Sequence, residues 1–304
     1  MTALALSSMF AQQARFAHGA VFAHWAARAG YDAIELSHWT PREQGEAIRD
    51  AGVLPICGVH SPAPFRRDDR GLANSALNLA ATDDTERRAA VAAAIESVRW
   101  AHELGATASV VHLGHVAATM PNLRELLRRA QAADPPQAGL DALRQAAVEE
   151  RERRAGPFLE AAARSLAEII AVAEPLGVMV GLESRLGFAE IPLPAECAAL
   201  LAPYPATVAG WWADIGHVEV LHRLGLVDRS RWEACVGERL VGAHVHDVDG
   251  LRDHRAPGNG NIDWGAYAPL LRQLPSLTLE VDQREPGELV AGARAFLAAR
   301  GLVA

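Results

Sequence analysis

The stretch LGVMVGLES at residues 176–184 decides the fold that we expect for this chain. It places a glycine where a helix should end, then a short apolar run typical of a buried strand, and then Glu183 at the end of that strand. The same order of helix, glycine and strand recurs in GYDAIEL at 30–36 and in LGATASVVHLG at 104–114. This alternation predicts a parallel sheet whose strands are covered by helices.

Eight such strands can be placed along the chain, and most of them are nearly all apolar. They are residues 3–8, 32–36, 53–60, 107–113, 178–183, 208–214, 240–246 and 277–282. Helices are predicted between them, among others at 20–29, 84–104 and 158–176. Eight strand–helix units suit a closed (β/α)₈ barrel, a TIM barrel, better than an open sheet. We expect residues 1–304 to form a single domain of this kind.

The connection after the fourth strand, about residues 114–156, is much longer than the others. Its composition is rich in Leu, Ala, Arg and Glu, and Pro135 and Pro136 interrupt it. We interpret it as a helical insertion on the face where the strands end, because loops on that face surround the active site in this architecture. The sequence leaves open whether the insertion covers the site as a lid or only lines the rim.

Composition excludes several kinds of chemistry. All 29 basic residues are arginine, so mechanisms that need a lysine amine, such as Schiff-base formation, are excluded. The three cysteines, Cys57, Cys197 and Cys235, lie far apart and form no CxxC pair. They indicate neither a disulfide framework nor a structural zinc knuckle.

The charge and hydropathy of the chain bear on its partners and location. The net charge of −8 disfavours nucleic acid as a partner, although one local basic patch could still bind it. No apolar run is long enough to span a membrane, and the N-terminus lacks the features of a signal peptide. We therefore expect a cytoplasmic protein without a membrane partner.

Seven of the eight predicted strands end in ionisable side chains that can bind a metal. These side chains are Glu35, His60, His112, Glu183, Asp214, the pair His244 and His246, and Glu280. Charged groups are seldom buried without partners, and the strand ends of a barrel meet at one face, so we expect these groups to converge. Carboxylates brought together repel each other, and a cation is the simplest neutraliser. Mixed carboxylate and imidazole ligands suit Mn²⁺, Zn²⁺, Co²⁺ or Fe²⁺ better than Ca²⁺.

We therefore expect one divalent metal. No phosphate-binding loop is present, so we expect no nucleotide or organic cofactor. Taken singly, each strand-end residue could instead be a hydrogen-bonded core residue, and an ion pair with an arginine explains Glu35 as well as a substrate contact does. Such structural uses would not all fall at one end of a barrel, which favours the metal site. The histidines outside the strand ends receive no role: His18, His24, His38, His102, His115 and His222.

Seven motifs occur in the order of the predicted strands. They are GYDAIEL (30–36), VVHLG (110–114), GLES (181–184), ADIGH (213–217), AHVHD (243–247), DHRAPGNGNIDW (253–264) and LTLEV (277–281). In this order and spacing the chain resembles the xylose isomerase-like TIM barrel superfamily. That group includes sugar and sugar-phosphate isomerases and epimerases, and the endonuclease IV (AP endonuclease) family of DNA-repair nucleases. The resemblance covers nearly the whole chain.

The resemblance to the epimerase branch implies a set of roles. One divalent metal would be held by Glu183, Asp214, His244 and Glu280, and Glu183 and Glu280 would also move the substrate proton. The other candidate residues would contact the substrate: Glu35, His60, His112, His217, His246, His254 and Arg255. His246 is in addition the reserve candidate for the metal.

These roles predict an isomerase or epimerase that acts on a small sugar, keto-sugar or polyol by proton transfer through an enediolate. A sugar-acid or polyol dehydratase on the same site is a close variant. The substrate would be a small molecule, and the sequence leaves a homo-oligomer open.

Two alternatives from other classes remain. In an endonuclease-IV-like phosphodiesterase, His60, His112, His217 and His254 could hold further zinc ions. That nuclease has an aspartate where Arg252 stands here, which puts a third zinc in doubt, and the acidic net charge argues against DNA. A non-catalytic ligand-binding barrel ranks last, because it would leave an intact set of ligands without use.

Overall fold

The computed structural model describes residues 2–116, 119–131 and 139–303. Eight parallel strands close into a barrel in the order β1, β10, β7, β6, β5, β4, β3, β2. They are β1 (Ala3–Ser7), β2 (Ala33–Leu36), β3 (Ile56–Ser61), β4 (Ala108–Val111), β5 (Met179–Glu183), β6 (Ala209–Asp214), β7 (Leu240–Val245) and β10 (Ser276–Leu279). The expected (β/α)₈ barrel is confirmed, and each barrel strand overlaps one of the eight predicted strands.

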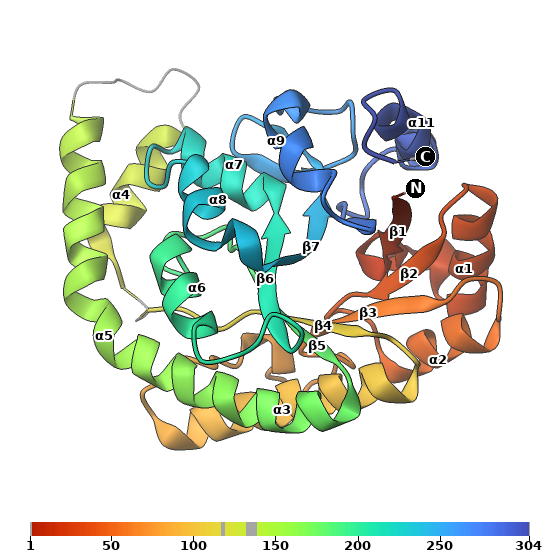
Figure 1. Cartoon of the computed structure of the whole chain (residues 1–304), viewed down its shortest axis with the longest axis horizontal. Helices are drawn as coiled ribbons and strands as arrows, with labels where there is room; N and C mark the ends of the chain where they lie inside the picture. Colours follow the sequence, from red (N-terminus) through yellow and green to blue (C-terminus); the bar gives the residue numbers. More distant parts are fainter. Residues whose placement is uncertain (1, 117–118, 132–138, 304) are drawn as a thin grey trace.

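Helices lie on the outside of the barrel (Figure 1). The α-helices are α1 (Gly19–Arg28), α2 (Arg42–Asp50), α3 (Asp84–Glu103), α4 (Pro121–Ala130), α5 (Leu140–Ala173), α6 (Pro194–Leu201), α7 (Ile215–Arg223), α8 (Ser230–Val236), α9 (Trp264–Leu271), α10 (Gly287–Ala291) and α11 (Ala293–Ala298). Short 3₁₀ helices are η1 (Ser8–Ala11), η2 (Ala14–Phe16), η3 (Asn74–Ala76), η4 (Glu174–Leu176) and η5 (Gly237–Arg239). Strands β8 (Asp247–Asp249) and β9 (Arg252–Arg255) form a separate antiparallel hairpin.

Local sequence signals set several helix ends. Gly105 and Gly177 follow helices with φ values of 73° and 67°, a left-handed conformation that glycine adopts without strain. At the start of α9, the Asp263 carboxylate accepts a hydrogen bond from the Gly265 amide, as expected for a capping residue. The helix–glycine–strand pattern therefore has a direct local cause.

The helix expected at 158–176 begins much earlier, at Leu140, and runs through Pro157. A proline inside a helix removes one backbone hydrogen bond and costs about 3 kcal/mol. Helix α5 continues because residues on both sides of Pro157, among them Ala147, Ala155 and Ala162, are buried. It packs against α3 and α4 along its length (Figure 1). The predicted insertion thus consists of α4 and the first half of α5, while Pro135 and Pro136 lie outside the described residues.

Despite its 34 residues, α5 is too polar to cross a membrane. Within the described ranges, no other helix has the length and apolar composition that crossing requires.

Trp212 on β6 fills the inside of the barrel beneath the strand ends. A Cβ atom at Gly181 on β5 would lie 2.8 Å from the Trp212 ring, and one at Gly242 on β7 would lie 2.2 Å from it. These two glycines therefore leave the space that the indole occupies. Trp211 points the other way and stacks on Trp232 with ring centroids 5.5 Å apart. Both tryptophans are buried core residues.

Glu219 joins α7 to α9. Its carboxylate accepts hydrogen bonds from Arg223 Nε and from the Tyr267 hydroxyl, both at 2.8 Å. Burial alone would raise the pKa of Glu219, but Arg223, Tyr267 and Arg229 lower it below its ordinary value. The folded state therefore binds the Glu219 proton more weakly than the unfolded chain, so this network stabilises the fold when the carboxylate is ionised.

We predict that Glu219→Gln lowers the free energy of unfolding at neutral pH by about 1–3 kcal/mol, because it leaves buried donors poorly paired. The difference from wild type should shrink as the pH falls below the ordinary pKa of a glutamate, since the wild-type carboxylate then becomes protonated. Urea denaturation between pH 3 and pH 7 tests this, with Glu160→Gln on the exposed face of α5 as the control. A constant difference over the whole pH range would contradict the prediction.

Candidate metal centre at the barrel mouth

Four side chains that the sequence predicted as metal ligands lie together at the carboxyl ends of the strands. Glu183 ends β5, Asp214 ends β6, His244 lies in β7, and Glu280 directly follows β10. The register pairs Asp214 with His244 and His244 with Thr278, so these ends are level with one another. One ligand atom of each of the four residues lies within 4.8 Å of the others, and all four are buried.

His244 is at the centre of this group. Its Nδ1 atom lies 2.8 Å from Glu183 Oε1, 3.1 Å from Glu280 Oε2 and 3.7 Å from Asp214 Oδ2. Its Nε2 atom lies 2.8 Å from Glu35 Oε1. A carboxylate that holds the outer nitrogen of a histidine is the usual support of a metal-binding imidazole. Glu35 therefore orients His244, and within the described residues it pairs with no arginine.

The buried carboxylates of this group favour a cation among them. Burial alone would lower the pKa of His244, but Glu280 and Glu35 raise it well above its ordinary value. Burial would raise the pKa of Glu280, but His244 and His60 hold it well below the ordinary value. The proton on His244 thus partly balances the buried carboxylates, and a divalent ion would balance them more fully.

Asp214 shows that the donors fit a metal. Its Oδ1 atom accepts hydrogen bonds from the His217 amide at 2.8 Å and from His246 Nε2 at 2.9 Å. Its Oδ2 atom is buried and has no hydrogen-bond partner in the described part of the chain. This oxygen faces His244 Nδ1, so its lone pairs are available to an ion between the four residues.

A second group flanks the centre on the side of β3 and β4. His112 Nε2 lies 2.5 Å from His60 Nε2 and 2.7 Å from Glu183 Oε2. The guanidinium of Arg185 reaches the same point, with its Nη1 atom 2.6 Å from His112 Nε2. Burial and Arg185 hold the pKa of His112 well below its ordinary value, so its ring is neutral.

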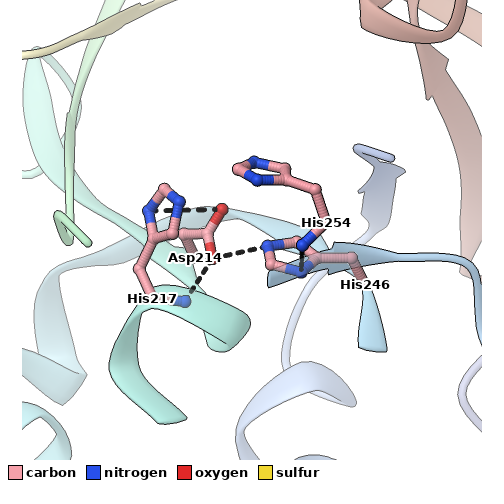
Figure 2. Close-up of side chains that lie close together, drawn as sticks. All are labelled: Asp214, His217, His246 and His254. Atoms are coloured by element: carbon pink, nitrogen blue, oxygen red, sulfur yellow. Dashed lines mark hydrogen bonds and ion pairs between the residues drawn. The ribbon is translucent and has the colours of Figure 1, made fainter. Parts of the chain in front are cut away.

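A third group lies on the side of β6 and β7 and comprises Asp214, His217, His246 and His254 (Figure 2). His217 Nδ1 donates to the Ser184 carbonyl at 3.0 Å, and its Nε2 atom lies 3.4 Å from Asp253 Oδ2. Burial would lower the pKa of His217, but Asp214 and Asp253 raise it. The side chain of His254 is 17 % exposed, so a substrate could reach it.

His246 has both ring nitrogens engaged. The His254 amide donates to its Nδ1 atom at 2.9 Å, and its Nε2 atom lies 2.9 Å from Asp214 Oδ1 (Figure 2). Gly216 makes room for the ring, because a Cβ atom there would lie 1.9 Å from His246 Cε1. These contacts indicate that His246 orients Asp214. Its expected substrate contact stays a prediction.

The hairpin β8–β9 places His254 next to Asp214, His217 and His246. Asp247 fixes the following loop by accepting hydrogen bonds from the amides of Val248, Gly258 and Ile262. His254 has a φ of 51°, which is strained for a residue with a side chain and is held by the amide contact to His246.

Arg255, the next residue, points to a different partner. Its Nε atom lies 3.1 Å from Glu285 Oε1. The structure therefore brings together ten of the eleven predicted site residues in the three groups, and Arg255 lies beside them in an ion pair. The roles of these residues in binding and catalysis remain predictions.

The family model described as xylose isomerase-like TIM barrel matches residues 23–300. The chain belongs to this family. No curated protein sequence shows significant similarity to the chain.

Solved structures support the same fold for this xylose isomerase-like barrel. A D-tagatose 3-epimerase-like protein superposes with a TM-score of 0.67 and 19% identity, over 98% of this chain and 96% of that one. The 3-keto-D-glucoside 4-epimerase of Escherichia coli gives a TM-score of 0.65 and 15% identity over 98% and 100%. A Thermus thermophilus protein soaked with zinc chloride gives 0.60 and 21% over 98% of both chains. At these identities the likeness concerns the fold.

Three residues of this barrel's site escaped the sequence reasoning. Arg185 lies two residues beyond β5, where only the strand-end residue was considered. His38 follows β2, and its ring lies 5.2 Å from that of His60 and 5.5 Å from that of His112. Asp253 was quoted only as the first residue of the motif at 253–264. An ionisable residue two positions after a strand end was the signal that could have found Arg185 and His38, whereas Asp253 lies within β9 and carries no such signal.

We predict that Gly216→Ala destabilises the protein by about 1–3 kcal/mol, because the new methyl group would collide with the His246 ring. A displaced ring would also release Asp214, so affinity for a divalent ion should fall about 10- to 100-fold. Thermal denaturation and metal titration measure the two effects.

The double-mutant cycle with His246→Ala is the control. If the collision is with this ring, Gly216→Ala should cost little more stability once the ring is gone. Additive losses would show that the cause lies elsewhere.

Proposed function

We propose that this protein is a divalent-metal-dependent isomerase or epimerase of a small keto-sugar or polyol. The observation that carries the proposal is the buried group Glu183, Asp214, His244 and Glu280, with ligand atoms within 4.8 Å of one another. It lies at the barrel face where enzymes of this architecture have their active sites. The likeness to solved sugar epimerases is consistent with it. The identity of the metal, Mn, Zn, Co or Fe, stays a prediction.

The two glutamates are placed to handle a proton. Glu183 and Glu280 reach His244 Nδ1 from strands β5 and β10, which are separated in the barrel by β6 and β7. One carboxylate can therefore remove a proton from a carbon next to a carbonyl, and the other can return it from a different direction. When bound, a divalent ion supplies Lewis-acid polarisation of that carbonyl. The return position of the proton decides between isomerisation and epimerisation.

The surrounding residues would bind and orient the substrate. His217 and His254 present ring nitrogens beside Asp253, where they can contact hydroxyl groups. Trp212 closes the barrel below, with its ring centroid 5.5 Å from that of His244, and excludes water from that side. A cavity of about 210 Å³ adjoins the second group, and its lining includes Asn74, Ser75, His112, Arg185 and Glu190. Its polar lining suits the hydroxyl groups of a small sugar.

One observation favours a second candidate, a metal-dependent phosphodiesterase. Two histidine-rich groups flank the centre, and more than one ion is typical of sites that cleave phosphate esters. A dehydratase would use the same four central residues, so only its product would distinguish it from an isomerase.

We predict that the protein purified without chelator contains about one Mn, Co, Fe or Zn ion per chain at the four central residues. Elemental mass spectrometry should show that this ion is lost in the variant with both Glu183→Gln and Glu280→Gln and kept in Glu160→Gln. Two or three zinc ions per chain would favour the phosphodiesterase. Absence of metal in wild type, even after incubation with each ion, would refute the proposed centre.

We predict that the metal-loaded protein incorporates deuterium from ²H₂O into the carbon next to the carbonyl of a keto-pentose or keto-hexose. NMR spectroscopy detects this exchange and distinguishes an epimer, an aldose or a dehydrated product. Glu183→Gln and Glu280→Gln should each lower the rate at least about 100-fold, because each removes one proton-transfer group. A variant that is folded and as active as wild type would contradict its assigned role.

A further inference from the structure

Arg185 places a fixed positive charge at the second group, next to His112 and Glu183. Its Nη1 atom bonds to Glu183 Oε2 and lies 2.6 Å from His112 Nε2. The same His112 nitrogen lies 2.5 Å from His60 Nε2 and 2.7 Å from Glu183 Oε2. One imidazole nitrogen and a carboxylate oxygen thus meet at one guanidinium nitrogen, and the imidazole of His60 lies against that of His112.

Without Arg185, these donors would resemble a site for a divalent ion. Ring nitrogens of His38, His60 and His112 lie within 4.8 Å of one another. The Nδ1 atom of His38 is buried and lacks a hydrogen-bond partner in the described part of the chain. His60 turns its Nε2 atom toward His112, while its Nδ1 atom lies 3.4 Å from Glu280 Oε1 in the central group. Glu183 would be shared, since its Oε1 atom faces His244 and its Oε2 atom faces His112. Such a set of imidazoles and one carboxylate suits Zn²⁺ or Co²⁺.

Arg185 is held firmly in this position. Its Nε and Nη2 atoms donate to Glu190 Oε1 at 3.0 and 2.9 Å, and Glu190 Oε2 accepts from the Gly187 amide at 2.6 Å. The side chain is exposed by 13 % only. An arginine keeps its charge at any relevant pH, and its planar fork is oriented by the paired glutamate. The charge at this point is therefore permanent.

The opposite side of the centre differs. In the group of Asp214, His217, His246 and His254, the side-chain partners among the described residues are carboxylates, imidazoles and backbone groups, and no arginine bonds to the ligand atoms. Within the described ranges, the fixed charge therefore lies on the side of His112 and not on that of His254.

We propose that Arg185 takes the place of a second metal ion. It occupies the space among His38, His60 and His112, prevents a divalent ion from binding there, and holds Glu183 Oε2 so that Oε1 stays directed at the central group. Arg185 is a positioning residue in this account. The inference rests on the proposed central metal site, because Glu183 is common to both groups. It disfavours phosphate-ester cleavage by two ions that share Glu183.

The test compares Arg185→Met, which keeps a similar stem without charge, with Arg185→Lys, which keeps a charge. Metal-free proteins are titrated with Co²⁺, and bound ions per chain are counted by elemental mass spectrometry and by visible absorption. Arg185→Met should bind about one ion more than wild type, and Arg185→Lys should match wild type. The extra ion should disappear when His60→Ala and His112→Ala are added to Arg185→Met.

If Arg185→Met does not fold, a variant that retains Arg185 still tests the proposal. His60→Ala with His112→Ala in the wild-type background should leave the number of bound ions unchanged, whereas a loss of one ion would overturn the proposal. A folded Arg185→Met variant that gains no ion would overturn it as well. Failure of the central site gives a different result, because wild type would then bind no ion that depends on Glu183 and Glu280.

Discussion

The burial of four carboxylates at one end of the barrel is the constraint on which the rest of the site depends. Glu35, Glu183, Asp214 and Glu280 are fully or almost fully removed from solvent. An uncompensated buried charge lowers the stability of the fold by roughly several kcal/mol. Each carboxylate must therefore have a cationic or hydrogen-bonding partner. His244 serves three of them within 3.1 Å, with one nitrogen toward Glu35 and the other toward Glu183 and Glu280. A divalent ion among them would complete the same balance.

The barrel makes this concentration of charge tolerable. Parallel strands in register bring their ends to one level, so groups far apart in the sequence meet without long loops. Trp212 fills the space below them, and Gly181 and Gly242 permit it to do so. The low polarity beneath the centre strengthens every charge interaction above it. The packed core and the polar site are therefore parts of one arrangement.

The two sides of the centre differ in charge. This difference is more informative about function than the fold is. One barrel hosts many reactions, so the site must decide among them. On one side Arg185 supplies a permanent charge next to neutral His112. On the other, His246 orients Asp214, and His217 and His254 surround the Asp253 carboxylate. One side of the centre therefore carries a fixed cation, and the other carries imidazoles paired with carboxylates.

The sequence by itself determined the barrel and the central group. Apolar runs behind glycines marked the strands, and a polar residue at the end of a parallel strand must face the barrel mouth, so Glu183, Asp214 and Glu280 could be placed together. Only the tertiary structure decided the rest. It showed that α5 passes through Pro157, because packing against α3 and α4 outweighs the local cost of the proline. It also showed what the side chains of Arg185 and His38 contact. Their place just past a strand end marks them as candidates, but their contacts depend on how distant segments pack together.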